Sequence, residues 1–235
     1  MNHFLSSTEL SAAYARDGYV IVPGLWSNDE CAALKAEALR VVAEHGRPNS
    51  SVFVGAAAAS PLFARYAADA RLVACLRALM PDGVAFMSDK VVFKATSQQI
   101  ATPWHTDALY WPGTRPKLST WIPLDDASEA NGTLKVVRGS HLREWRNRRG
   151  GGINAAGDFG LTIDPGQWDP ADELLCEIPR GSVVIFSDRL LHASAPNRLG
   201  ADRYTIIGTY HAPVAVEEEF DLGFEARKTL VPASG

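Results

Sequence analysis

The sequence predicts a mainly β protein with N-terminal helices, folded as a double-stranded β-helix, which is the jelly-roll or cupin-like architecture. Two observations support this prediction. About the first 80 residues show helical periodicity, whereas from Val84 onward short β-branched and aromatic runs alternate with turn residues. Amphipathic helices must bury one apolar stripe, and the outside of a single β-barrel is the simplest surface that can cover it.

Composition supports one globular domain over residues 1–235. The chain is 46% hydrophobic and 21% charged, with a formal net charge of −4, which argues against nucleic acid as a partner. The start has no leader pattern, and no apolar run approaches the roughly 18–20 residues of a membrane span. We therefore expect a cytoplasmic protein with no membrane partner, while the sequence leaves its oligomeric state open. Cys31, Cys75 and Cys176 form no close pair, so we expect neither disulfides nor a zinc site, and we expect Cys31 and Cys75 to be buried in helices.

Three helices are expected in the N-terminal region, which we interpret as a helical wrap over about residues 1–80. Serine or threonine caps precede the first helix and Gly18 ends it, while Ser27 or Asn28 caps the second helix and Gly46 follows it. The expected segments are "SSTELSAAYARDG" (6–18), "SNDECAALKAEALRVVAEHG" (27–46) and "DARLVACLRALMPDG" (69–83). A short β-rich run, "YVIVPGLW" (19–26), separates the first two.

The jelly-roll core is expected over about residues 84–212. Its strands are predicted in "VAFMSDKVVFKA" (84–95), "LSTWIPLDD" (118–126), "GTLKVVRGSH" (132–141), "GSVVIFSD" (181–188) and "RYTIIGTYHAP" (203–213). Residues 142–175 lack periodicity and are long for a connection, which predicts a lid-like insertion whose Gly150–Gly152 would allow movement. Its arginines are a solvated face or a contact for an acidic substrate: Arg143, Arg146, Arg148 and Arg149.

The stretch "PWHTDALYWP" (103–112) contains one histidine and one carboxylate two positions apart. By chance alone roughly one such pair is expected in a chain of this composition, so His105 and Asp107 need a third ligand to be informative. His192 is the best candidate, because it follows the predicted strand "SVVIF". Two imidazoles and one carboxylate on one side of an ion leave its other side open, as non-haem Fe(II) oxygenases require.

A keto-acid cosubstrate also needs a fixed cation for its distal carboxylate. Arg203 follows His192 by 11 residues at the start of the next strand, and guanidinium binds carboxylate in a bidentate fork. Ser194 could add a hydroxyl, and Lys94 could point inward from an earlier strand. The aromatic residues around the metal pair either line a substrate pocket or cap the barrel: Trp104, Tyr110 and Trp111. The other histidines are interpreted as a turn residue (His141), a strand residue (His211) and solvent-facing residues (His3 and His45).

Four segments in this order resemble the phytanoyl-CoA dioxygenase family of Fe(II)/2-oxoglutarate oxygenases: "WHTD", "STWIPLDDASEANGTLKVVRGSH", "HASAPNR" and "RYTI", within roughly residues 15–212. The resemblance implies that His105, Asp107 and His192 bind Fe(II). It implies that Arg203, assisted by Ser194, holds 2-oxoglutarate, with Trp121 and Thr133 also near the cosubstrate. The chain departs from the family in having Arg138 where proline often precedes "GSH".

The reaction that this resemblance implies uses molecular oxygen and 2-oxoglutarate to oxidise an unactivated C–H bond of a small molecule, most simply by hydroxylation. Two other functions stay open at this point: a metal-dependent cupin enzyme that does not use 2-oxoglutarate, and a non-catalytic jelly-roll binding module. Arg203 separates the first from the main hypothesis, because its replacement matters only if 2-oxoglutarate binds. Metal-dependent consumption of 2-oxoglutarate would exclude the second.

Overall fold

The computed structural model describes residues 6–47, 50–96, 101–111, 115–154, 157–213 and 228–232. Its helices are α1 (Ser7–Asp17), α2 (Asn28–His45), α3 (Ala56–Ala59), α4 (Pro61–Ala67) and α5 (Ala70–Leu79). Thirteen strands follow the same chain order: β1 (Tyr19–Val22), β2 (Val52–Val54), β3 (Val84–Lys94), β4 (Thr102–His105), β5 (Lys117–Pro123), β6 (Leu134–Val137), β7 (Asn147–Asn154), β8 (Gly157–Ile163), β9 (Glu173–Leu175), β10 (Val183–Ser187), β11 (His192–Ser194), β12 (Arg203–His211) and β13 (Lys228–Val231).

The predicted helices form where their capping signals stand. Ser6 accepts the Glu9 backbone N–H at the start of α1 while the Glu9 carboxylate accepts the Ser6 N–H, and Gly18 ends the helix with a left-handed φ of 82°. Ser27, not Asn28, caps α2. Helices α3 and α4 were not predicted, because the alanine run that forms α3 has no periodicity; Ser60 separates them and accepts the Leu62 N–H at the start of α4.

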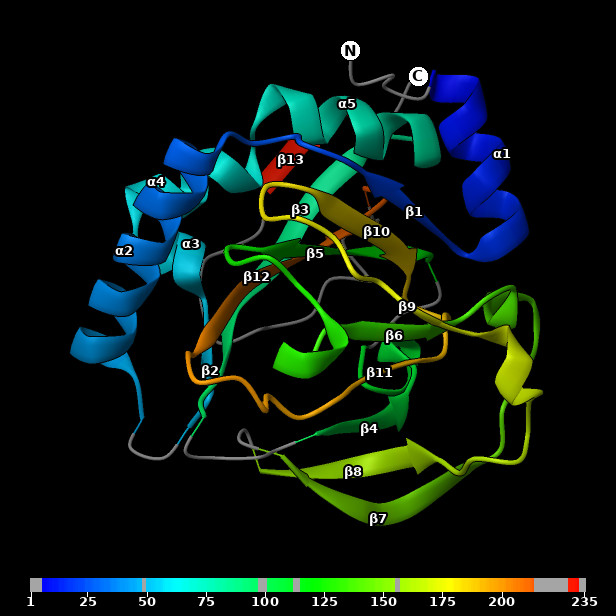
Figure 1. Ribbon diagram of the computed structural model, residues 1–235. Helices are drawn as coiled ribbons and strands as arrows, with labels where there is room; N and C mark the ends of the chain where they lie inside the picture. The colour runs from blue at the N-terminus through cyan, green and yellow to red at the C-terminus, as the bar shows by residue number, and fades with distance from the viewer. Residues whose placement is uncertain are drawn as a thin grey trace.

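Two sheets form the jelly roll, and the mainly β fold with flanking helices is confirmed. The larger has the strand order β1-β10-β5-β12-β3-β13, with β2 paired to β3; the smaller has the order β4-β11-β6-β9. The named strand pairs in both sheets are antiparallel, as expected. Figure 1 shows the helices along one side of the larger sheet and the smaller sheet on its other side.

A large apolar core joins the helices to the outer face of the larger sheet. Its buried side chains include Leu34 and Val41 of α2, Leu72 and Leu76 of α5, and Ile185 of β10. Burying such side chains contributes about 1.5–3 kcal/mol each, which explains why the helices stay on this face. The inner face of the same sheet carries polar side chains as well as apolar ones, and it is this face that forms the candidate site.

Strands β7 and β8 form a separate antiparallel pair within the segment interpreted as a lid. Asn147 lies opposite Ile163, and the register shifts between Arg149 and Gly152. Figure 1 places this pair beyond β4, on the side away from the helices. The sequence did not predict these strands because their glycines and charged residues interrupt alternation; the lid function stays a prediction.

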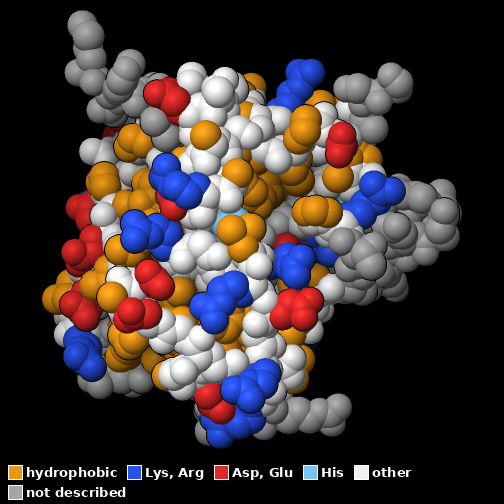
Figure 2. All heavy atoms as spheres, turned by 90° about the vertical axis from the view of Figure 1, so that its right-hand side faces the viewer, with side chains coloured by type: hydrophobic (Ala, Val, Ile, Leu, Met, Phe, Trp, Pro, Cys, Tyr) orange, Lys and Arg blue, Asp and Glu red, His pale blue; other side chains and the backbone are white. Residues whose placement is uncertain are grey.

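The surface carries charges of both signs. On the face shown in Figure 2, Lys and Arg side chains lie among Asp, Glu and hydrophobic side chains. Among the described residues, no helix is both long enough and apolar enough to cross a membrane. The three thiols are free, with Cys31 and Cys176 buried and Cys75 partly buried.

Candidate metal centre

Two antiparallel strands bring the candidate histidines together. His105, at the end of β4, lies directly opposite His192, at the start of β11, and their ring centroids are 4.1 Å apart. Directly opposed residues project to the same face of a sheet. Strand β4 ends at His105, and a 3-10 turn, η1 (Asp107–Leu109), begins at the carboxylate. This change of direction lets the Asp107 carboxylate converge with the His105 imidazole.

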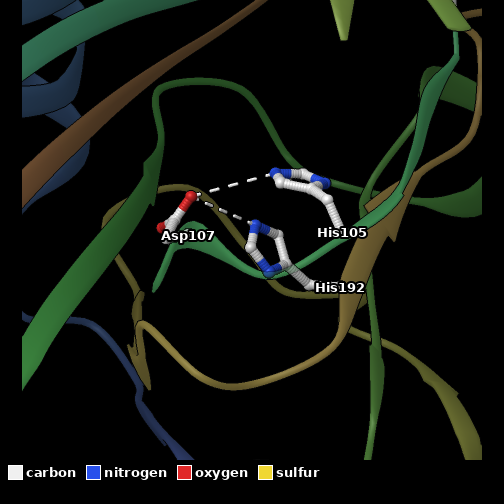
Figure 3. Close-up of side chains that lie close together, drawn as sticks. All are labelled: His105, Asp107 and His192. Atoms are coloured by element: carbon white, nitrogen blue, oxygen red, sulfur yellow. Dashed lines mark ion pairs between the residues drawn. The ribbon is translucent and has the colours of Figure 1, made fainter. Parts of the chain in front are cut away.

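The three side chains converge on one point, as Figure 3 shows. The Nε2 atoms of His105 and His192 each lie 3.8 Å from Oδ1 of Asp107. The potential ligand atoms of all three residues lie within 4.8 Å of one another, and all three are buried. Imidazole and carboxylate donors bind metal ions at about 2.0–2.2 Å, so donors 3.8 Å apart can share one ion.

Backbone carbonyls fix the orientation of both imidazoles. The Nδ1 atom of His105 lies 2.9 Å from the Pro103 carbonyl oxygen, and the Nδ1 atom of His192 lies 2.9 Å from the Leu190 carbonyl oxygen. A carbonyl can only accept, so each Nδ1 carries the proton and each Nε2 presents its lone pair to the centre. In both cases the carbonyl belongs to the residue two positions earlier, so each strand end orients its own ligand.

Asp107 is oriented by two contacts that its own segment does not supply. The Ser119 hydroxyl, on β5, donates to Oδ2 at 2.6 Å, which leaves Oδ1 facing both histidines. The Ala108 N–H donates to the Asp188 carbonyl at 2.8 Å and holds the 3-10 turn. Ser119 was not among the sequence candidates, because only the fold brings β5 beside the turn that holds Asp107.

The charges of the centre favour metal binding. Burial lowers the pKa of both imidazoles, and the repulsion from a protonated His192 would lower that of His105 further, so both rings are neutral at pH 7. Burial alone would raise the pKa of Asp107, but a protonated His192 and the charge of Lys90 lead the effects that lower it. Two neutral imidazoles and one ionised carboxylate are the donors that a divalent non-haem iron ion prefers.

Arg203 lies in the same cavity and is held by groups far away in the sequence. Its Nε donates to the Asn131 carbonyl at 3.0 Å, one Nη donates to the Gly132 carbonyl at 3.0 Å, and the other donates to the Thr205 hydroxyl. Guanidinium has five N–H donors, so two remain for a ligand. Burial lowers the pKa of Arg203 to about 10, and no carboxylate among the described residues forms an ion pair with it. This arrangement fits the distal carboxylate of a keto acid.

The cavity that joins the triad to Arg203 has a volume of about 320 Å³. It is lined by residues of both sheets: Val52, Val54, Ser88, Asp89, Lys90, Val92, Lys94, Thr102, His105, Asp107, Trp111, Trp121, Leu134, Phe186, His192, Ala193, Ser194, Arg203, Ile207 and Thr209. Lys94, Ser194 and Trp121 thus line the same cavity as the triad, and their contact with a cosubstrate stays a prediction. The Arg203 guanidinium carbon stands 5.2 Å from the centre of the Trp121 ring. Volumes of about 300–1,000 Å³ are usual for small-molecule sites.

Three sequence candidates lie elsewhere. The Thr133 hydroxyl is buried and donates to the Cys176 carbonyl at 2.5 Å, away from the residues that line the cavity. Trp104 packs edge-on against Trp168 with ring centroids 5.1 Å apart. The Tyr110 hydroxyl donates to the Leu161 carbonyl at 2.5 Å and so connects the metal-ligand turn to β8. Of the three aromatic candidates, only Trp111 lines the cavity.

The remaining histidines among the described residues do not join the triad. His211 is buried on β12, and its Nδ1 lies 2.6 Å from the Ala212 carbonyl oxygen. His45 has a half-exposed side chain. His141 lies in the turn η3 (Ser140–Leu142) beside Tyr14, as the sequence predicted for a turn residue. Its Nδ1 has no hydrogen-bond partner among the described residues, although a backbone hydrogen bond with Ala15 acts on the ring. His3 falls outside the described residues.

Fold and site together define a jelly-roll protein with a candidate two-histidine, one-carboxylate metal centre next to a buried arginine. The chain belongs to the phytanoyl-CoA dioxygenase (PhyH) family, whose model matches residues 14–205.

Among curated proteins, the ectoine dioxygenase of Sphingopyxis alaskensis is 31% identical over 153 residues, which cover 57% of this chain and 50% of the relative. The chain thus spans about half the length of that protein. The solved structure of EctD from S. alaskensis, with 2-oxoglutarate and 5-hydroxyectoine, is 25% identical with a TM-score of 0.73 and covers 97% of this chain and 86% of that one. The epimerase SnoN, solved with Fe3+, α-ketoglutarate and nogalamycin RO, is 24% identical with a TM-score of 0.74, covering 97% and 96%, and shows the shared fold.

Proposed function

We propose that the chain is an Fe(II)- and 2-oxoglutarate-dependent dioxygenase that hydroxylates an unactivated C–H bond of a small organic molecule. One observation carries the proposal: His105, Asp107 and His192 converge in the same cavity of about 320 Å³ as Arg203. A metal centre alone would also suit a cupin enzyme of another class. The buried guanidinium is the feature that such an enzyme does not need.

In this proposal the triad holds Fe(II) on one side, and Arg203 holds the distal carboxylate of 2-oxoglutarate through the two N–H donors that the protein leaves unused. The bound iron, oxygen and 2-oxoglutarate would supply the oxidising chemistry. Ser194 and Lys94 line the cavity and would add hydrogen bonds to the cosubstrate. Trp121, whose side chain is 4% exposed, shields Arg203 from water.

Hydroxylation is the simplest of the outcomes that this chemistry allows. The proteins similar to this chain include dioxygenases, a proline hydroxylase and an epimerase, so their reactions differ. What separates the outcomes is the position in which the cavity holds the reacting C–H bond.

The test is an anaerobic titration of the protein with Fe(II) and then 2-oxoglutarate, followed through the visible metal-to-ligand charge-transfer absorption of a chelated keto acid. We expect the absorption to appear in the unsubstituted protein, to be absent in His105→Ala and to require much more 2-oxoglutarate in Arg203→Met. Arg198→Met is the matched control, since this exposed arginine lies outside the cavity. Admitting oxygen should then give succinate.

Two results would contradict the proposal. Tight metal binding with no dependence on Arg203 would indicate a metal-dependent cupin enzyme that does not use 2-oxoglutarate. Absence of metal binding would indicate a binding module without catalysis.

A further inference from the structure

The strand register divides the cavity into two parts. On β12 and β3, Arg203 lies opposite Lys94, whereas Ile207 lies opposite Lys90. Opposed residues share a face, and so do residues four positions apart on one strand, so these four side chains project into the same cavity. Because a strand rises by about 3.3 Å per residue, the Lys90 backbone lies roughly 13 Å along the strand from the Lys94 backbone. Lys90 and Arg203 therefore lie well apart along these two strands, and both line the cavity.

Lys90 lies on the side of the cavity that β2 forms. Val54 of β2 pairs with Lys90 and Val52 pairs with Val92, and all four side chains line the cavity. On its other flank, Lys90 has Ile207, which in turn pairs with Trp121. Lys90 is thus flanked by apolar residues on both neighbouring strands, four residues away from the position that faces Arg203.

The charge of Lys90 has no counter-charge among the residues that the structure describes. Among the described residues, no carboxylate forms an ion pair with it, and no hydrogen bond from its ammonium is found. Burial raises the pKa of Asp107, and a protonated His192 and then the charge of Lys90 lower it. The charge of Lys90 therefore acts on a residue of the metal triad. Asp107 and the keto-acid carboxylate of 2-oxoglutarate would together balance a divalent metal ion, and the distal carboxylate would balance Arg203, so the charge of Lys90 would stay unmatched.

We propose that the substrate carries a carboxylate, which Lys90 binds, and an apolar part, which packs against Val52, Val54 and Trp111. This inference rests on the proposed function and names the substrate class for the same site. A partly buried ammonium is stabilised when it donates a charge-assisted hydrogen bond to a ligand carboxylate. The cavity of about 320 Å³ must also hold 2-oxoglutarate, so the enclosed substrate is small.

The test uses the protein loaded anaerobically with Fe(II) and saturating 2-oxoglutarate, so that Arg203 is occupied. Acetate, butyrate, benzoate and cyclohexanecarboxylate are titrated beside their primary amides, and binding is followed by the shift of the charge-transfer absorption and by tryptophan fluorescence. We expect at least one acid to bind about tenfold or more tightly than its amide, because only the acid forms a charge-assisted bond. This preference should vanish in Lys90→Met and persist in Lys90→Arg.

Lys94→Met provides the matched comparison on the same strand. We expect Lys94→Met to weaken 2-oxoglutarate more than the acids, and Lys90→Met to weaken the acids more than 2-oxoglutarate; melting temperatures establish that both variants fold. Equal affinity for acids and amides, an unchanged preference in Lys90→Met, or a greater loss of 2-oxoglutarate than of acid in Lys90→Met would overturn the inference. So would a protein that binds Fe(II) and 2-oxoglutarate but none of the acids. A protein that binds neither Fe(II) nor 2-oxoglutarate would instead overturn the proposed function itself.

Discussion

The metal end and the arginine end of the cavity are built in different ways. At the metal end, each imidazole is oriented by the carbonyl of the residue two positions earlier, Pro103 for His105 and Leu190 for His192. At the arginine end, the guanidinium of Arg203 is held by the carbonyls of Asn131 and Gly132, which lie 72 and 71 residues earlier. One end depends mainly on local geometry, and the other depends on the packing of distant segments.

The two ends also differ in charge. The histidines are neutral before any ligand arrives, because burial lowers their pKa. Arg203 keeps its charge although it is buried, and the protein offers it carbonyl and hydroxyl oxygens but no carboxylate among the described residues. Carbonyls satisfy N–H groups without cancelling the charge, so this end stays ready for an anion. We therefore expect substitutions at the two ends to act on different ligands.

The largest effect should come from Asp107→Ala, which removes the only carboxylate of the triad. Altering groups that merely orient metal ligands costs about 10–100-fold in affinity, so loss of the ligand itself should lower metal affinity by more than about 100-fold and abolish succinate formation. Metal content after dialysis and equilibrium titration with Fe(II) measure it. Asp82→Ala, at an exposed turn outside the cavity, is the control and should bind metal normally.

The second effect tests whether the arginine end is separate. Arg203→Met should weaken 2-oxoglutarate by about 100-fold, because it removes a charge-assisted fork, and leave metal affinity within a few-fold. It also leaves the carbonyls of Asn131 and Gly132 without their donor, so the free energy of unfolding should fall by about 1–3 kcal/mol. Arg203→Lys should recover little binding, since one ammonium cannot replace the planar fork. If metal affinity fell as far as 2-oxoglutarate affinity, the two ends would not be independent.

The difference between the ends also explains what the sequence could predict. The histidines and the carboxylate could be proposed from the sequence, because the metal end is built from short local segments at strand ends. Arg203 could be proposed because it follows His192 by a short distance in the chain. The carbonyls that hold it were not, because only the fold brings residues 131 and 132 beside 203.

Register accounts for the other omissions. Ser119 and Lys90 acquire their roles from the strands they face, although Lys90 and Lys94, four residues apart on one predicted strand, could have been placed on the same face. Trp104 and Tyr110, which flank the ligands, were expected either to line a substrate pocket or to cap the barrel, and they pack toward Trp168 and β8. Proximity in sequence did not indicate which side of the strand each ring would occupy.

A third and smaller effect should appear in Ser119→Ala. The substitution removes the hydrogen bond that turns Oδ1 of Asp107 toward the histidines, so we expect metal affinity to fall by about tenfold while 2-oxoglutarate affinity of the loaded protein changes little. Thr120→Ala is the control, because the next hydroxyl on β5 donates to the Gly208 carbonyl instead. An unchanged metal affinity in Ser119→Ala would mean that the turn at Asp107 orients the carboxylate without this bond.

The smallest effect is a pH dependence that belongs to the arginine end. Burial, followed by the charge of Arg203, lowers the pKa of Lys94 to about 7. A carboxylate ligand favours the ammonium form, so 2-oxoglutarate affinity should be highest below about pH 7 and decline above it, by at most about tenfold per pH unit for one proton. Arg203, with a pKa of about 10, stays charged throughout this range.

Titration of 2-oxoglutarate between about pH 6 and pH 8.5 measures this decline, and Lys94→Met supplies the comparison. The variant should bind more weakly at the acid end and show no decline, because its side chain carries no proton to lose. The histidines cannot produce the same decline, since losing a proton as the pH rises would strengthen ligand binding at the metal end, and burial already lowers their pKa values. A decline that persists in Lys94→Met would assign it to the metal end and remove the electrostatic difference between the two ends.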